Sequence, residues 1–130
     1  MPKIKKVIIV EDEKDLAEMY KEKLISQGFR VNIITDSRKA MTKIKQGADM
    51  VLLDILMPGL NGFELLKKIK SDKNICEIPV VVLTNIGSES ADKDRNLALS
   101  LGAVDYMVKS LNTPLDVLNK INKILSSINK

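Results

Sequence analysis

The stretch Met50-Val51-Leu52-Leu53-Asp54 decides the fold, because it is a continuous apolar run of strand length that ends in a carboxylate. A run without polar alternation is typical of a strand that is buried on both faces. Four more runs of strand length, rich in valine and isoleucine, lie at residues 5–10, 29–34, 80–83 and 104–108. Strands buried on both faces belong to parallel sheets that helices cover on each side. The sequence therefore predicts a parallel sheet of five strands.

Segments with helical spacing of apolar residues separate these runs. They occupy residues 16–24, 40–44, 63–69 and 115–128. Gly28, Gly47 and Gly102 each stand between a helical stretch and the next strand, where the residue after a helix often adopts a left-handed conformation. This alternation predicts an α/β fold of the (βα)5 type, a doubly wound parallel sheet with helices on both faces. Residues 1–130 contain no linker or repeat and are predicted to form a single domain.

The composition excludes several classes of chemistry. The 130 residues include no histidine and one cysteine, Cys76. An intramolecular disulfide, a Cys/His zinc site, a histidine-dependent triad and a phosphohistidine are therefore excluded. The lone cysteine and the lack of an export signal or membrane-spanning segment predict a cytoplasmic protein without membrane insertion. The net charge is +4, but basic and acidic residues are interspersed, so we do not expect this domain to bind nucleic acid.

Polar side chains that can do chemistry stand at the ends of four predicted strands. In a doubly wound sheet, ligands bind outside the carboxyl ends of the strands. The residues at these ends are Glu11, Asp12 and Glu13 after the first strand, Asp54 after the third, Thr84 after the fourth and Lys109 after the fifth. The sequence therefore predicts that several acids, a hydroxyl and an ammonium group meet at one edge of the sheet.

This set of side chains suits a metal ion and a phosphoryl group. Carboxylates at close range raise one another's pKa, so the cluster is stable at neutral pH mainly when a cation lies among them. Oxygen ligands indicate a hard cation such as Mg²⁺. A carboxylate beside Mg²⁺ and a lysine can also attack a phosphoryl group and form an aspartyl phosphate, with the threonine hydroxyl as a further hydrogen-bond donor.

Each of these residues also has an ordinary structural explanation. The acids at residues 11–15 favour the positive end of a helix, and Asp54 precedes a Pro-Gly turn. Thr84 is a β-branched strand residue, and Lys109 can be a solvated lysine at a strand end. Their joint occurrence, each at the expected strand end, favours a functional site over these separate explanations.

Four segments resemble the receiver domain of two-component response regulators. They comprise residues 7–13, 51–62, 81–84 and 102–109, in the order and with the spacing of that family. The resemblance implies a flavodoxin-like fold with strand order 2-1-3-4-5, similar to single-domain chemotaxis regulators. It also implies a phosphoacceptor switch in two-component or phosphorelay signalling and not an enzyme. The phosphodonor would be a histidine kinase or a histidine phosphotransfer protein.

The resemblance assigns roles to individual residues at the predicted edge. It implies that Asp54 is both the phosphoacceptor and a metal ligand, that Asp12 binds Mg²⁺ directly, and that Glu11 acts through metal-bound water. The backbone carbonyl of Leu56 would complete the protein ligands of the metal. Lys109 would pair with the phosphoryl group.

The resemblance further implies a switch pair, Thr84 and Tyr106. Thr84 would move toward the phosphoryl group, and Tyr106 would swing inward into the space that Thr84 leaves. This movement would alter the surface made by the fourth helix, the fifth strand and the fifth helix, where a protein target would bind. The alternative for Tyr106 is an ordinary half-buried aromatic whose hydroxyl reaches water.

Several positions depart from the family pattern. Ser110 follows Lys109 where the family usually has a proline joined by a cis peptide. A cis bond costs about 2.5–4 kcal/mol before other residues and about 0.5–1 kcal/mol before proline, so the conformation of this peptide and the position of Lys109 stay open. Asn85 stands where the family prefers a very small residue. Leu56 and Ile86 are apolar, which predicts a persistent aspartyl phosphate because apolar cover hinders an attacking water.

Two other functions compete with the phosphoacceptor switch. A phosphatase of the haloacid dehalogenase-like type also forms an aspartyl phosphate, but it needs a second aspartate two residues after the nucleophile, where this chain has Leu56. A degenerate receiver would act as a phosphorylation-independent docking module. Ser110 keeps that alternative open, whereas the complete set of acids, threonine and lysine argues against it.

Overall fold

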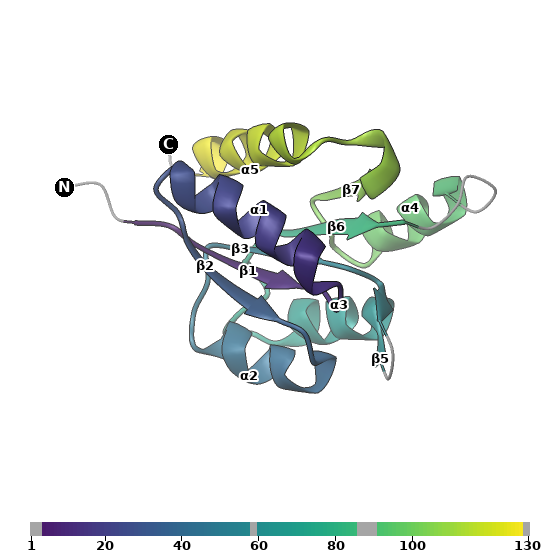
Figure 1. Ribbon diagram of the computed structural model, residues 1–130. Coiled ribbons are helices and arrows are strands. Elements are labelled where there is room, and N and C mark those ends of the chain that lie inside the picture. Colours follow the sequence, from purple (N-terminus) through teal and green to yellow (C-terminus); the bar gives the residue numbers. More distant parts are fainter. Residues whose placement is uncertain (1–3, 58–59, 86–90, 129–130) are drawn as a thin grey trace.

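A computed structural model describes residues 4–57, 60–85 and 91–128. Its main sheet (Figure 1) contains five strands: β1 (Lys6–Val10), β2 (Arg30–Ile34), β3 (Met50–Leu53), β6 (Val80–Thr84) and β7 (Asp105–Val108). Every pair of neighbours is parallel. The strands lie in the order β2-β1-β3-β6-β7, which is 2-1-3-4-5 along the chain. The predicted flavodoxin-like α/β fold is confirmed, and the predicted strand ends agree to within one residue.

Helices cover both faces of this sheet (Figure 1). α1 (Lys14–Ser26) and α5 (Pro114–Ile128) pack on one face, and α2 (Ala40–Lys45), α3 (Gly62–Ser71) and α4 (Ala91–Ser100) pack on the other. Two short 3-10 helices, η1 (Ser37–Lys39) and η2 (Lys109–Leu111), follow β2 and β7. In the part of the chain that the structure describes, no helix is long and apolar enough to cross a lipid bilayer.

The central strand β1 shows why the apolar runs have no polar alternation. Val7 and Ile9 belong to the core beneath α1 and α5, whereas Ile8 and Val10 belong to the core beneath the other three helices. All four side chains are almost completely buried, and each such burial stabilises the fold by about 1.5–3 kcal/mol. A continuous apolar run is therefore the pattern of a strand covered on both faces.

Local signals set the ends of the helices. Gly28, Gly47 and Gly102 have φ angles of 91°, 114° and 108°, which is the left-handed conformation expected from their positions. α5 begins with a capping box in which the Thr113 hydroxyl accepts a hydrogen bond from the Asp116 backbone N–H (3.1 Å). The Asp116 carboxylate in turn accepts one from the Thr113 backbone N–H (2.9 Å). Two of the donors at the start of the helix are thereby satisfied.

A short hairpin follows β3 that the sequence did not predict. β4 (Leu56–Met57) pairs in antiparallel fashion with β5 (Leu60–Asn61). The sequence indicated only a turn around Pro58 and Gly59, which lie outside the described residues. α3 starts directly after this hairpin, where the Asn61 side chain accepts a hydrogen bond from the Phe63 backbone N–H at 2.9 Å and caps the helix.

α4 also lacked a signal of its own in the sequence. Among its described side chains only Ala98 is buried, while Leu97 and Leu99 are largely exposed. A helix with one small buried residue has no apolar stripe that periodicity can detect. Its presence was expected only from Gly102 and from the alternation of strands and helices.

Candidate functional site

Four strands bring polar side chains to the carboxyl edge of the main sheet. Glu11 follows β1, Asp54 follows β3, Thr84 ends β6 and Lys109 follows β7. The backbone N–H of Glu11 donates to the last carbonyl of β2, and that of Asp54 donates to the last carbonyl of β1, both at 3.0 Å. The ladder of the sheet thus continues onto the acidic residues and fixes their backbone. The sheet brings together the residues that the sequence had placed at separate strand ends.

Three carboxylates form the acidic part of the site. Glu11, Asp12 and Asp54 each offer an oxygen, and these oxygens lie within 4.8 Å of one another. Glu11 is 3% exposed and Asp54 is 6% exposed, whereas Asp12 is partly exposed and Glu13 is fully at the surface before α1. An all-oxygen set of this charge suits a hard divalent cation. The chemistry of the three acids therefore fits the Mg²⁺ ion that the sequence predicted.

The Lys109 side chain reaches this acidic cluster from the end of β7. Its ammonium group donates to the Glu11 carboxylate and, at 3.3 Å, to Asp54 Oδ2. The side chain is 6% exposed. The peptide bond between Lys109 and Ser110 is trans, as are the other peptide bonds of the described residues. The trans peptide therefore still places the lysine among the acids, which answers the question that Ser110 raised.

Burial and charge shift the pKa values of two groups in the site. Burial raises the pKa of the Glu11 carboxyl to about 7, with a contribution from the neighbouring Asp54, although the hydrogen bond from Lys109 opposes this rise. For Lys109, burial disfavours the charged form, but the hydrogen bond to Glu11 and the charges of both acids outweigh it and raise its pKa above the usual value. Lys109 is therefore a cation at neutral pH.

The predicted switch residues, Thr84 and Tyr106, lie on the neighbouring strands β6 and β7. Thr84 is fully buried and is paired with Val108 in the sheet, while Tyr106 is paired with Val82. Tyr106 is only 5% exposed, and its hydroxyl has no hydrogen-bond partner among the described residues. Burial, together with the charge of Asp94, raises the pKa of this phenol. The alternative of a half-buried tyrosine with its hydroxyl in water is therefore wrong for this structure.

Gly62 supports the site in a way that the sequence analysis did not foresee. Its backbone N–H donates to the Ile55 carbonyl at 3.2 Å, and a Cβ atom at this position would lie 2.3 Å from the Ile55 Cα. Ile55 connects Asp54 with Leu56, whose backbone carbonyl is the predicted metal ligand. The start of α3 therefore presses directly on the segment that carries two predicted metal ligands. A glycine at the first position of a helix was the available signal.

The sequence also singled out Asn85, Leu56 and Ile86, for other reasons. Asn85 is exposed directly after β6. The Leu56 side chain and the whole of Ile86 lie outside the described residues. The predicted persistence of the aspartyl phosphate, which rests on these two residues, stays a prediction.

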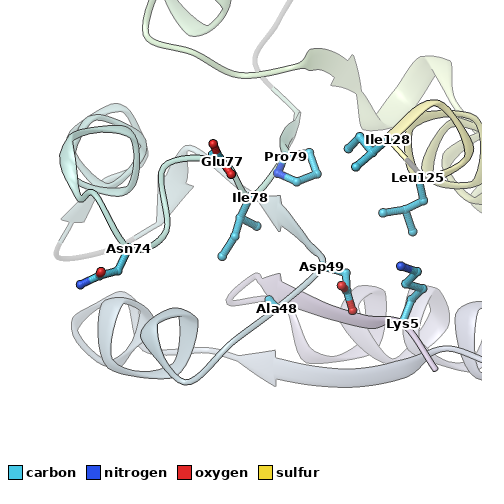
Figure 2. A pocket seen from close by; sticks show the side chains of 9 residues that line it. All are labelled: Lys5, Ala48, Asp49, Asn74, Glu77, Ile78, Pro79, Leu125 and Ile128. Carbon is cyan, nitrogen blue, oxygen red and sulfur yellow. The ribbon is translucent and has the colours of Figure 1, made fainter. Parts of the chain in front are cut away.

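A pocket of about 290 Å³ lies away from this site, by the first residues of β1, β3 and β6 and the end of α5. Figure 2 shows the side chains that surround it: Lys5, Ala48, Asp49, Asn74, Glu77, Ile78, Pro79, Leu125 and Ile128. Asp49 accepts a hydrogen bond from the Lys6 backbone N–H at 2.7 Å. The pocket lies by the amino ends of these parallel strands, whereas Glu11, Asp54, Thr84 and Lys109 lie at the carboxyl ends, so the pocket and the candidate site are at opposite edges of the sheet.

Comparison with known proteins gives the family. The response regulator receiver domain family matches residues 7–122. The chain is 37% identical over 107 residues to the transcriptional regulatory protein CpxR of Klebsiella pneumoniae, covering 82% of this chain and 44% of that protein. It is 31% identical over 124 residues to the response regulator SaeR of Staphylococcus aureus, covering 95% of this chain and 52% of that protein.

A solved structure agrees with this match. The CheY-like response regulator receiver domain protein of Methanospirillum hungatei superposes with a TM-score of 0.85 at 26% identity, covering 96% of each chain. The protein described here therefore belongs to the response regulator receiver domain family, a family of signalling switches in two-component systems. Receiver domains bind Mg²⁺ at an acidic pocket and take phosphate from histidine kinases. The chain spans about half the length of the curated relatives it matches.

Proposed function

We propose that residues 1–130 act as one phosphoacceptor receiver unit whose Asp54 takes a phosphoryl group in a Mg²⁺-dependent reaction. The observation that carries this proposal is the meeting of Asp54, two further acids and the Lys109 ammonium at the carboxyl edge of the sheet. The donor is a histidine kinase or a histidine phosphotransfer protein. We assign the chain to the cytoplasm, because its lone Cys76 suits a reducing compartment.

The transfer itself needs little covalent chemistry from the protein. A carboxylate oxygen of Asp54 attacks phosphorus, a P–O bond forms, and the P–N bond to the donor imidazole breaks, leaving an aspartyl phosphate and a histidine. Asp12, Asp54, the Leu56 carbonyl and, through a bound water, Glu11 would hold Mg²⁺, which would supply positive charge to the phosphoryl oxygens. The ammonium group of Lys109 supplies a second positive charge to the phosphoryl oxygens. The hydroxyl at the end of β6, on Thr84, donates a hydrogen bond to the same group.

The switch couples the phosphoryl group to the surface formed by α4, β7 and α5. Phosphate shifts the balance between two arrangements of Thr84 and Tyr106, and the favoured arrangement changes what this surface binds. A pocket of about 370 Å³ on this surface supports the proposal, because its lining includes Tyr106 together with charged groups of both signs, among them Arg95, Asp105 and Lys120. Such a mixed surface suits a protein target better than a nucleic acid.

Intact-mass analysis tests the proposal. The protein is incubated with acetyl phosphate and MgCl₂ beside an Asp54→Asn variant and a sample treated with a chelator. We expect a single phosphoryl adduct on the wild-type chain that is absent in both controls. An adduct of equal yield on Asp54→Asn would contradict the assignment of the phosphoacceptor.

The geometry gives less support to the two competing functions. Ser110, which kept the docking-module alternative open, does not draw Lys109 away from the acids. The phosphatase alternative needs a carboxylate at position 56, where the chain has Leu56. The phosphoacceptor switch is therefore the function that the arrangement of these residues supports best.

A further inference from the structure

Asn112 contacts both peptide groups that flank Lys109. Its side-chain nitrogen Nδ2 donates a hydrogen bond to the Val108 carbonyl at 2.9 Å, and its backbone N–H donates to the Lys109 carbonyl at 3.4 Å. The first carbonyl belongs to the peptide before the Lys109 Cα atom, and the second belongs to the peptide after it. The side-chain bond is the shorter of the two, and it is the bond that a substitution can remove. Together they restrict rotation of the backbone at Lys109.

The position of Asn112 in the chain connects an edge strand with a packed helix. β7 lies at the edge of the main sheet, and Lys109 follows its last residue as the first residue of η2. Asn112 ends η2 with an extended backbone conformation. The next residue, Thr113, begins the capping box of α5, and α5 is packed into the core. Asn112 therefore ties the end of β7 to the fixed start of α5.

The direction in which the Lys109 side chain leaves the backbone matters for the site. The side chain is 6% exposed, and its ammonium group donates to Asp54 Oδ2 at 3.3 Å. Because the ammonium group stands at the end of a flexible four-carbon stem, a small rotation of the backbone moves it by a much larger distance. A misplacement of about 1 Å in a reacting site can cost about 100-fold in rate.

We infer that Asn112 is a positioning residue for phosphoryl transfer, which fixes the backbone on both sides of Lys109 and so directs the ammonium group to Asp54. This inference rests on the proposed function and deepens it. It also gives a physical reason why Lys109 reaches the acids although its peptide bond to Ser110 is trans. The hydrogen bonds of Asn112 go to main-chain carbonyls and not to the acids, so its effect on the reaction passes through Lys109.

An isosteric substitution tests this role. Asn112→Asp keeps the shape of the side chain, but a carboxylate has no hydrogen to donate to the Val108 carbonyl. We expect the rate of Mg²⁺-dependent phosphorylation by acetyl phosphate, followed by intact mass, to fall by about tenfold. Asn119→Asp, at an exposed position of α5, adds the same charge and should stay within about twofold of the wild type. An unchanged rate in Asn112→Asp, or equal losses in the two variants, would overturn the inference.

A double-mutant cycle separates an effect through Lys109 from a general loss of structure. In the Lys109→Met background, we expect Asn112→Asp to change the phosphorylation rate by less than about twofold, because the residue through which it acts is already absent. Urea unfolding should show the same change in stability on Asn112→Asp in both backgrounds. A tenfold loss of rate that persists without Lys109 would assign Asn112 a role independent of the lysine and would overturn the inference.

A second measurement does not depend on phosphorylation. The wild-type and Asn112→Asp chains are treated with acetic anhydride, and acetylation of Lys109 is followed by mass spectrometry with the exposed Lys68 as the internal reference. We expect the ratio of Lys109 to Lys68 labelling to rise severalfold in Asn112→Asp, because a misdirected ammonium group leaves its buried position. An unchanged ratio would overturn the inference but leave phosphorylation of Asp54 intact. A raised ratio in a chain whose wild type gains no phosphoryl adduct would instead overturn the proposed function.

Discussion

At the scale of single residues, burial sets the pKa of Glu11 at the carboxyl edge of the sheet. Glu11 is nearly inaccessible, and burial raises the pKa of its carboxyl to about 7. Glu11 therefore gains and loses its proton within the pH range of ordinary experiments, and Mg²⁺ must compete with that proton for the carboxylate. Lys109 stays charged throughout this range because its pKa is raised as well.

The raised pKa of Glu11 predicts a pH dependence of metal binding. The folded protein holds the proton more tightly than the unfolded chain, so the stability that Glu11 contributes is fully present below the ordinary glutamate pKa and is lost as pH rises through about 7. At a pH where Glu11 is ionised, bound Mg²⁺ offsets this loss of stability, because it neutralises the buried carboxylate. We therefore expect MgCl₂ to raise Tm more at about pH 8 than at about pH 6. Thermal unfolding at both pH values checks this, and an equal shift would contradict it.

The close approach of Gly62 to Ile55 leads to a second prediction at the scale of single residues. In Gly62→Ala the new Cβ meets the Ile55 backbone at 2.3 Å, so Ile55 and the neighbouring Asp54 must shift. We expect a loss of about 1–3 kcal/mol in the free energy of unfolding and weaker Mg²⁺ binding, measured by denaturant unfolding and calorimetry. Gly28→Ala is the control, because its φ of 91° strains the backbone but no atom lies near the added Cβ. It should lose stability without a change in Mg²⁺ affinity; equal loss of affinity in both variants would refute the account.

At the scale of elements, a single lysine ties α3 to the start of β6. The Lys70 ammonium donates to the carbonyls of Cys76 (2.9 Å) and Ile78 (2.7 Å), and its alkyl chain would lie 2.9 Å from a Cβ at Gly102. Burial lowers the pKa of this lysine. The side chain therefore joins the end of α3, the segment that leads into β6 and the turn that leads into β7.

We expect Lys70→Met to weaken this junction. The substitution keeps most of the alkyl packing but leaves two carbonyls without their donor, and a partly buried group that loses its partner costs about 1–3 kcal/mol. Urea unfolding should show a loss in this range. Lys68→Met, at an exposed position of the same helix, should stay within about 0.5 kcal/mol of the wild type. Similar losses in the two variants would show that the hydrogen bonds of Lys70 do not stabilise the junction.

The elements differ in how far the sequence could predict them. β1 and β3 were predicted because strands covered on both faces must be apolar at every position. α4 was not marked by periodicity, because it buries only Ala98 among its described side chains. The hairpin of β4 and β5 has two residues in each strand, which is too short for an alternating pattern to appear.

At the scale of the whole molecule, the parallel sheet is what assembles the site. Glu11, Asp54, Thr84 and Lys109 could be placed at one edge from the sequence, because parallel strands in one sheet end on the same side. The contact between Glu11 and Lys109 could not be predicted, since it depends on side-chain conformations at the ends of β1 and β7. The role of Gly62 was also missed, because it depends on how closely α3 approaches the segment after β3.

The central claim is that this fold directs a phosphoryl group to Asp54, and trapping of the acyl phosphate tests it most directly. The protein is incubated with acetyl phosphate and MgCl₂, then reduced with borohydride, which converts a phosphorylated aspartate to homoserine, and its peptides are sequenced by mass spectrometry. We expect homoserine at position 54 alone, and only when Mg²⁺ is present. Homoserine at Asp12, or no conversion at position 54 in protein that binds Mg²⁺, would contradict the account.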